Sequence, residues 1–322
     1  MDESDLLRSV AERAIAYRAG LANAPVTPTA TPEALRAALG GPTPEHPADP
    51  SDVIRRMADV AEAGGLMGMK IARFTEGGRT RLGIVTTDTD EIIDVGTADP
   101  SLPSDLGPLL AGPGLASAAR TASTAPRLAL SAVQLEAPIA QPPTFLAIGL
   151  NYADHVAESG SQRPAVPVVF NKQVTCVVGP GAGIEVPTVA PKWVDYEGEL
   201  GVVIGTRCRN VSVDDAASVV AGYLIVNDVS VRDWQRATPT MTMGKSWDTH
   251  GPIGPWLVSA DEVGDPHDLT IHTWVDGDLR QDASTKQMIT NCWEIIAHLS
   301  TAFTMVGSLH RLVPGCRADP PR

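Results

Sequence analysis

Cysteines are few in this sequence and lie far apart. The 322 residues contain four, none in a C-x-x-C pair and none beside histidines at zinc-ligand spacing: Cys176, Cys208, Cys292 and Cys316. Disulfide scaffolds are dense in cysteine, and structural zinc sites need cysteines or histidines at close spacing. The sequence therefore argues against a disulfide scaffold and predicts reduced thiols.

Long apolar runs and positive charge are also scarce. No stretch approaches 18 consecutive apolar residues, and the first five residues are acidic where a signal peptide is basic. Lys and Arg number 25 against 38 Asp and Glu, a net charge of −13, which disfavours nucleic acid and anionic membranes as partners. We expect a cytoplasmic protein that binds neither, and whose ligands can still be small anions where a local cation attracts them.

Glycine and proline, in contrast, are abundant. The chain has 29 Gly and 27 Pro, with 43% hydrophobic and 20% charged residues, which is the composition of a soluble globular protein rich in turns. At roughly 150 residues per domain, the length predicts about two domains. Frequent turns favour strands and loops over a helical bundle, so we expect a mainly β fold with some α.

Residues 1–66 differ in texture from the rest. They are rich in Ala, interrupted by Pro, and predict three short helices. The order Leu-Leu-Arg, Ala-Tyr-Arg, Ala-Pro-Val-Thr-Pro and Pro-Glu-Ala-Leu-Arg-Ala-Ala-Leu resembles the N-terminal arm of group II pyridoxal-phosphate decarboxylases, which wraps a partner subunit. Nothing after residue 66 continues that pattern. We therefore expect an appended helical arm and no pyridoxal phosphate.

From Met69 onward, short strand-like runs alternate with turn residues. Lys70–Phe74, Arg81–Thr87 and Glu91–Val95 predict a β-meander. Pro, Gly, Ala and Ser then recur at short intervals, which predicts a connector with one helical patch over residues 98–141. The predicted regions are a helical arm (1–66), a small N-terminal β domain with its connector (69–141), a catalytic domain (142–305) and an irregular tail (306–322).

The strongest chemical signal is the run Asp-Tyr-Glu-Gly-Glu-Leu at 195–200. Alternate residues of a strand share a face, so the carboxylates of Glu197 and Glu199 come close together. Asp228 follows a second apolar run and can converge on this pair. Such close like charges persist if a cation neutralises them, if one is protonated, or if water solvates them. Two interpretations stay open here: a site for a hard cation such as Mg²⁺ or Mn²⁺, or a solvated acidic face.

A histidine and a lysine are candidates for moving protons and stabilising charge. His155 and Glu158 lie three residues apart in a predicted helical turn, where they share a face. A carboxylate that orients an imidazole makes a general base for water, although such a pair also occurs as a simple surface contact. Lys245 lies between a glycine and an aromatic segment, where its ammonium can face a cleft or be solvated.

Six motifs in order between residues 69 and 303 resemble the fumarylacetoacetate hydrolase family. They are Gly-Leu-Asn-Tyr-Ala-Asp-His (149–155), Phe-Asn-Lys (170–172), Asp-Tyr-Glu-Gly-Glu-Leu (195–200), Asn-Asp-Val-Ser-Val-Arg-Asp (227–233), Gly-Lys-Ser-Trp-Asp-Thr (244–249) and Gln281 with Ser284-Thr285. The resemblance implies an α+β fold built on a mixed β-roll, usually as a homodimer. It also implies Mg²⁺ or Mn²⁺ held by Glu197, Glu199 and Asp228, and a water-activating lid dyad of His155 and Glu158. The residues resembling those that line the substrate site are Lys245, Lys172, Arg232 and Gln235.

The resemblance implies a metal-dependent hydrolase that cleaves a carbon–carbon bond in a small anionic acylpyruvate or β-diketo acid, as in aromatic catabolism. A metal can polarise the keto oxygen and stabilise the departing enolate, with Lys245 nearby. Because enolate stabilisation is a shared step, the alternatives are an isomerase, decarboxylase or lyase acting on a 2-keto or 2-hydroxy-dienoate acid. A non-catalytic truncated remnant is the alternative from another class.

The sequence departs from the family after Met305. The family continues there with Pro-Gly-Asp, then a Thr-Gly-Thr-Pro turn that lines the active site, and then closing strands. Residues 306–322 contain neither motif, and they show neither a strand period nor a helix stripe. We therefore expect an irregular tail that does not replace the missing strands, an exposed sheet edge, and impaired activity.

Overall fold

The computed structural model describes residues 68–153, 162–305 and 309–311. The chain divides into two compact units, residues 1–68 and 69–322, and the fold below is that of the second unit. The helices predicted within 1–66 lie outside the described residues. Among the helices that are described, none is both long enough and apolar enough to cross a membrane.

The small β domain begins with the predicted meander and gains two further strands. Its strands are β1 (Lys70–Glu76), β2 (Arg79–Thr86), β3 (Glu91–Ile93), β4 (Arg127–Ala129) and β5 (Gln134–Glu136). β1 pairs with both β2 and β5, and β3 lies between β2 and β4. The turn between β1 and β2 uses Gly77 and Gly78, both at positive φ, where a side chain would be strained.

The segment predicted as a connector is part of this domain. Besides β4 and β5 it carries helical turns, which are α4 (Val95–Ala98), α5 (Leu106–Ala111), α6 (Leu115–Thr121) and the 3₁₀ turn η2 (Leu130–Ala132). Asp94 and Asp105 begin α4 and α5, and each side chain accepts a hydrogen bond from a backbone N–H of the first turn. The expectation of a single helical patch here is therefore wrong.

The remaining strands form the larger part of the unit. They are β6 (Phe145–Gly149), β7 (Val168–Asn171), β8 (Val177–Val178), β9 (Val194–Asp195), β10 (Gly198–Ile204), β11 (Val220–Asn227), β12 (Ser230–Val231), β13 (Gly251–Ser259), β14 (Thr270–Val275), β15 (Asp278–Ser284) and β16 (Leu309–Arg311). The helices are α8 (Arg232–Ala237), α9 (Thr242–Lys245), α10 (Ala260–Val263) and α11 (Cys292–Ala302), with 3₁₀ turns η3 (Val174–Cys176), η4 (Ala216–Val219) and η5 (Thr285–Gln287). The fold is mainly β with some α, as predicted.

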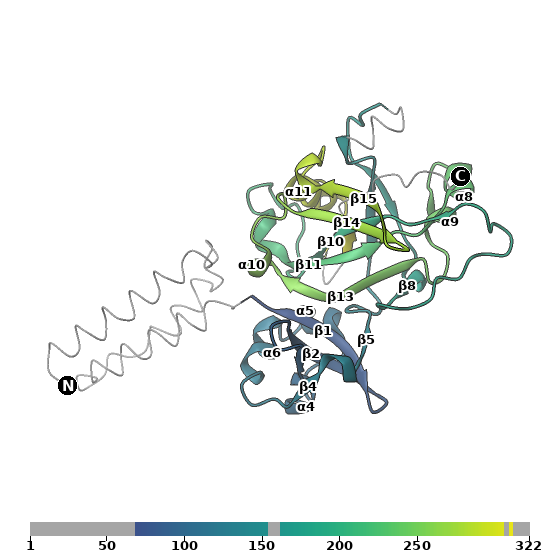
Figure 1. The fold of residues 1–322 in the computed structure, drawn as a ribbon. Coiled ribbons are helices and arrows are strands. Elements are labelled where there is room, and N and C mark those ends of the chain that lie inside the picture. The colour runs from purple at the N-terminus through teal and green to yellow at the C-terminus, as the bar shows by residue number, and fades with distance from the viewer. Residues whose placement is uncertain (1–67, 154–161, 306–308, 312–322) are drawn as a thin grey trace, which may run out of the picture. The chain divides into compact units, whose positions relative to one another are not determined.

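One 12-stranded sheet connects both parts of the unit. Its order is β4-β3-β2-β1-β13-β11-β10-β16-β6-β7, with β5 beside β1 and β8 beside β13. β14 and β15 form a separate hairpin that lies with α11 on one side of β10, β11 and β13 (Figure 1). The hairpin approaches β10 closely at Gly198, where a Cβ would meet Thr273 Oγ1 at 2.4 Å.

β16 lies within the segment predicted to be an irregular tail. Its three residues pair antiparallel with β10 and parallel with β6, so they join the β6–β7 pair to the rest of the sheet. The expectation that residues 306–322 contribute no strand is therefore wrong at Leu309–Arg311. Residues 312–322 lie outside the described residues.

The main core lies between β10 and α11. Leu200, Val202 and Ile204 alternate along β10 and pack with buried side chains of α11, including Ile295 and Ile296. Each such buried aliphatic side chain contributes about 1.5–3 kcal/mol to folding. Because strand residues alternate, Glu199 lies on the opposite face of β10. The core thus fixes the strand whose other face carries the acidic residues.

Candidate functional site

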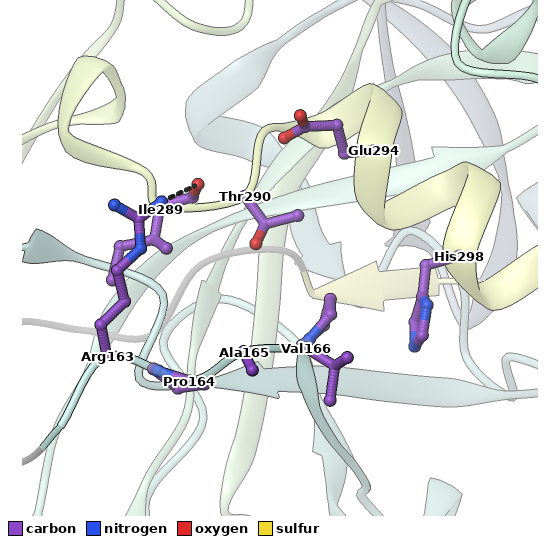
Figure 2. A pocket seen from close by; sticks show the side chains of 9 residues that line it. Arg163, Pro164, Ala165, Val166, Ile289, Thr290, Glu294 and His298 are labelled. Carbon is purple, nitrogen blue, oxygen red and sulfur yellow. Dashed lines mark hydrogen bonds between the residues drawn. The ribbon is translucent and has the colours of Figure 1, made fainter.

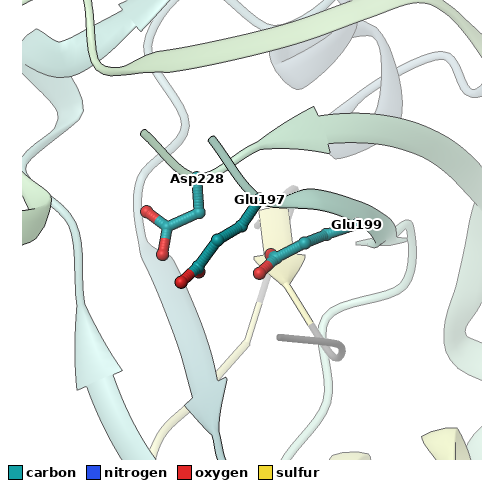
Figure 3. Close-up of side chains that lie close together, drawn as sticks. All are labelled: Glu197, Glu199 and Asp228. Atoms are coloured by element: carbon teal, nitrogen blue, oxygen red, sulfur yellow. The ribbon is translucent and has the colours of Figure 1, made fainter. Parts of the chain in front are cut away.

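Three buried carboxylates meet where β10 begins and β11 ends. Glu197 precedes β10, Glu199 lies within it, and Asp228 directly follows β11, whose Asn227 pairs with Gly198. The Asp228 amide donates to the Glu197 carbonyl at 2.8 Å, and the Glu197 amide donates to Asn227 Oδ1 at 3.1 Å. The residues are only 3%, 0% and 0% exposed, and one oxygen of each lies within 4.8 Å of the others (Figure 3). The three carboxylates therefore converge, with Glu197 and Glu199 close together as the strand alternation predicted, and they do not form a solvated face.

Two lysines neutralise part of this charge. Lys245 Nζ lies 2.7 Å from Glu197 Oε2 and 2.5 Å from Asp228 Oδ2, and Lys172 Nζ lies 2.5 Å from Asp228 Oδ1. Lys172 also donates to the backbone carbonyls of Lys245 and His250. Both lysine side chains are almost completely buried, at 2% exposure or less. Their ammonium groups thus hold the segment 245–250 against the carboxylates.

The short helix α9 brings Lys245 to the site. Gly244 packs so closely on α8 that a Cβ would meet the Gln235 amide nitrogen at 2.1 Å, so this position requires glycine. The Lys245 ammonium also lies 5.4 Å from the centre of the Phe170 ring, within reach of a cation–π interaction. The sequence left open whether the Lys245 ammonium faces a cleft or is solvated. In the structure it is buried beside the carboxylates.

Arg232 supplies the third cation of the site. It forms ion pairs with Glu197 and, at 2.7 Å, with Asp195, and its NH1 donates to Gln235 Oε1 at 3.0 Å. Burial alone would lower the pKa of the guanidinium, but the two carboxylates more than offset this and raise it above its ordinary value. Arg232 is therefore a permanent cation that fixes Glu197 and orients Gln235.

Three residues that the sequence did not single out also belong to the surroundings of the site. Asp195 holds Arg232, and the signal for it was its place in the same acidic motif as Glu197.

His250 is fully buried, and its Nε2 lies 2.9 Å from the Glu185 carbonyl oxygen. Burial lowers the pKa of His250, which favours the neutral ring. Trp247 stacks edge-on against Trp234, with ring centres 5.1 Å apart. The sequence did not point to His250, because it has no histidine at ligand spacing and its hydrogen-bond partner, Glu185, is distant in the chain.

The donor set fits a hard divalent cation. All three converging side chains offer carboxylate oxygens, which Mg²⁺ and Mn²⁺ prefer, and no sulfur or imidazole lies among them. Seven charged groups form this cluster of ion pairs and carboxylates in the described part of the chain. Four are negative and three positive: Asp195, Glu197, Glu199 and Asp228 against Lys172, Arg232 and Lys245. The excess negative charge leaves the cluster able to accept a further cation.

Two predicted site residues, His155 and Glu158, lie outside the described residues. Their role as a water-activating dyad stays a prediction. The other seven predicted residues are all described. Ion pairs connect five of them, and the carboxylate of Glu199 lies beside those of Glu197 and Asp228. Gln235 joins this group through its hydrogen bond with Arg232.

A pocket of about 580 Å³ lies beside α11 and is distinct from the carboxylate cluster, because the two share no lining residue. Figure 2 shows Arg163 and His298 on opposite sides of it, with Thr290 between them. The remaining lining residues are Pro164, Ala165, Val166, Pro167, Ile289 and Glu294. Its lining carries charges of both signs, from Arg163 and Glu294.

Comparisons with known proteins agree with this architecture. Residues 144–309 match the family described as fumarylacetoacetate (FAA) hydrolase, C-terminal. A Burkholderia multivorans protein that carries only the provisional name of hydrolase is 40% identical over 74% of this chain and 83% of its own length.

Solved structures give the same result. A fumarylacetoacetate hydrolase from Exiguobacterium antarcticum is 32% identical, with a TM-score of 0.69 over 78% of this chain and 87% of its own. Maleylpyruvate hydrolase from Sphingobium sp. SYK-6, solved with manganese(II) and pyruvate, is 32% identical, with a TM-score of 0.65 over 79% and 91%. A 2-hydroxyhepta-2,4-diene-1,7-dioate isomerase from Mycobacterium marinum is 29% identical, with a TM-score of 0.64 over 79% and 90%. With its acidic triad on the shared fold, the chain belongs to the fumarylacetoacetate hydrolase family.

Proposed function

We propose that this chain is a metal-dependent hydrolase that cleaves a carbon–carbon bond in a small acylpyruvate or β-diketo acid. The observation that carries the proposal is the convergence of Glu197, Glu199 and Asp228 in a buried all-oxygen cluster. A relative of this fold was solved with manganese(II) and pyruvate, a keto acid of the same class as one expected product.

Glu197, Glu199 and Asp228 are the residues that would hold Mg²⁺ or Mn²⁺. When bound, such an ion supplies Lewis acidity toward a keto or carboxylate oxygen. Arg232 fixes Glu197, and Lys172 fixes Asp228, so both carboxylates are already oriented. Because these side chains are buried, little of the orientation has to be established when substrate arrives.

The three cations of the site suit an anionic keto acid. Lys245 is the group best placed to donate a hydrogen bond to an enolate oxygen, because it is the ammonium that contacts two of the carboxylates. Arg232 and Gln235 lie on the adjoining helix and would contact a substrate carboxylate. Lys172 is held by Asp228 and two carbonyls, so its role is to position the others.

In the proposed hydrolysis, His155 takes a proton from water while the water oxygen bonds to the distal carbonyl carbon. Glu158 orients the imidazole. The carbon–carbon bond then breaks, its electron pair forms the enolate of the departing keto acid, and that enolate takes up a proton. The products are a carboxylic acid and a keto acid such as pyruvate.

A second candidate is an isomerase, decarboxylase or lyase that uses the same enolate. The similarity to the Mycobacterium marinum isomerase favours this candidate, since a carboxylate cluster with a nearby ammonium would stabilise either enolate. We further propose a cytoplasmic homodimer. The buried thiols of Cys208 and Cys292, neither of them in a disulfide, suit a reducing compartment.

The test is a substrate panel assayed with Mn²⁺ present: acylpyruvates, oxaloacetate and 2-hydroxyhepta-2,4-diene-1,7-dioate. Loss of the enol absorbance reports any reaction, pyruvate formed without carbon dioxide reports hydrolysis, and carbon dioxide release reports decarboxylation. We expect pyruvate from an acylpyruvate. Absorbance change without pyruvate or carbon dioxide would establish the isomerase instead, and no turnover of any compound would favour a non-catalytic remnant.

The Glu197→Ala/Glu199→Ala double variant is the control for the panel. It should lose turnover together with the melting-temperature increase that Mn²⁺ gives to the wild type. Turnover that survives in the double variant would place the chemistry elsewhere in the chain.

A further inference from the structure

Two of the three carboxylates proposed to bind metal, Glu197 and Asp228, already pair with cations of the protein itself. Each oxygen of Glu197 and each oxygen of Asp228 has such a partner. Glu197 Oε1 pairs with Arg232, Asp228 Oδ1 with Lys172, and the two remaining oxygens, Oε2 and Oδ2, share the Lys245 ammonium.

The Lys245 ammonium bridges two carboxylates as a small ion would. Its nitrogen lies 2.7 and 2.5 Å from oxygens of Glu197 and Asp228, and oxygen–metal distances for Mg²⁺ are about 2.0–2.1 Å. An ion that binds both Oε2 and Oδ2 would therefore need the space of this ammonium. An ion that used the other oxygen of Glu197 or of Asp228 would meet Arg232 or Lys172 instead.

We infer that Lys245 is a resident counter-cation of the carboxylate cluster, and that an ion can bind only after the Lys245 ammonium leaves Glu197, Asp228 or both. The inference rests on the proposed metal site and adds a determinant of its affinity. The ring of Phe170, 5.4 Å from the ammonium, offers an attractive surface for the displaced group. Metal binding would then also free the Lys245 N–H groups for a substrate oxygen.

Lys172 provides a matched comparison. It carries the same charge and is equally buried, but its ammonium contacts only Asp228 among the carboxylates and is otherwise held by two backbone carbonyls. Removing either lysine changes the net charge of the cluster by the same amount. Only removal of Lys245 vacates the position between Glu197 and Asp228.

The experiment measures Mn²⁺ binding by calorimetry on the full-length wild type, Lys245→Met and Lys172→Met. We expect Lys245→Met to bind Mn²⁺ about tenfold more tightly than the wild type or better, and Lys172→Met to gain clearly less. The inference is overturned if Lys245→Met binds no more tightly than a wild type that does bind Mn²⁺, and the proposed metal site then still stands. Equal gains in both variants would overturn it as well, because net charge would explain them. Binding by none of the three proteins would overturn both the inference and the proposed function.

A crystal structure of the wild type with Mn²⁺ decides the matter if either variant does not fold. We expect Lys245 Nζ to have lost hydrogen-bonding distance to Glu197 or to Asp228. An ion on the three carboxylates with both lysine contacts retained would overturn the inference.

Discussion

Two buried ion networks among the described residues differ in how many carboxylates they bring together. In the small β domain, Arg81 donates through Nε to both oxygens of Asp94 at 2.9 and 2.8 Å, and through NH2 to Glu76 at 2.9 Å. Asp94 also accepts from the Thr97 amide and hydroxyl, which begins α4. The guanidinium lies 4.7 Å from the centre of the Phe74 ring.

The carboxylate cluster at β10 and β11 is built from the same kinds of groups in larger number. In the Asp94 network one fully buried carboxylate and the more exposed Glu76 share one cation, and Asp94 also begins a helix. The cluster brings three buried carboxylates together, with a fourth nearby, against three cations. Each network has one more negative group than positive groups, so net charge does not distinguish them. Of the two, the cluster is the one whose carboxylates lie close enough together to hold one ion, and the comparison therefore separates a structural ion pair from the proposed metal site.

The largest expected effect is a loss of stability when the Arg81–Asp94 pair is broken. Asp94→Asn removes the charge that Arg81 faces in the interior, and removing one partner of a buried ion pair costs about 3–5 kcal/mol. Chemical denaturation of both proteins measures the loss. A change of less than about 1 kcal/mol would mean that Glu76 or solvent replaces Asp94, and the distinction drawn above would fail.

The stability of the carboxylate cluster should depend much less on a single charge. Glu199→Gln removes one charge from an excess of negative charge, so the stability without metal should change by no more than about 1 kcal/mol in either direction. The melting-temperature increase given by Mn²⁺ should disappear, because one carboxylate ligand is lost. Thermal melts with and without Mn²⁺ test both statements together. A large loss of stability without metal would show that Glu199 is structural.

The pH dependence of the unfolding free energy should also show that Asp94 stabilises the fold. Burial alone would raise the pKa of its carboxyl, but the hydrogen bonds from Arg81 and Thr97 outweigh burial and lower the pKa below its ordinary value. The stabilisation is therefore complete above the unfolded pKa of about 4, and it is lost as the pH falls through the lower pKa of the folded state. The difference in unfolding free energy between wild type and Asp94→Asn should shrink in that acid range. A difference that is constant from pH 7 to pH 2 would contradict the assignment.

The smallest expected effect comes from the predicted arm. A variant that begins at Met69 lacks no residue of either network, so its Mn²⁺ affinity should stay within about twofold of the full chain, well under the 1.4 kcal/mol that corresponds to tenfold. Calorimetry on both proteins measures this. Loss of folding in the shortened chain would show that residues 1–66 cover part of the second unit, and the predicted boundary would be functionally wrong.

The sequence predicted β1, β2 and the short β3 that continues the same meander, and it missed the short strands β4, β5 and β16, for a physical reason. β1, β2, β10 and β11 are long enough to show alternation or an apolar run between turn residues. β4, β5 and β16 have only three residues each, so their strand state depends on the partner strand rather than on their own pattern.

In the site, too, the sequence predicted what local spacing determines and missed what depends on contacts between distant segments. The spacing of Glu197 and Glu199 was enough to predict that they share a face, since a strand fixes it locally. The contacts of Lys245 with both carboxylates, and of Lys172 with the Lys245 carbonyl, join distant segments and could not be read from spacing. The resemblance pointed to the lysines themselves, but what each one contacts came only from the fold.

The position of β16 has a consequence for the order in which the protein can form. Phe145 and Ala147 of β6 pair in parallel with Leu309 and Arg311, and β6 reaches β10 only through β16. On a ribosome, β6 and β7 emerge long before the strand that joins them to the sheet. Until β16 is synthesised, the edges of β6 and β10 that β16 later joins have no partner strand. The nascent chain is therefore most exposed to mispairing during synthesis of the segment between β7 and β16, and a chaperone that shields strand edges would act in that interval.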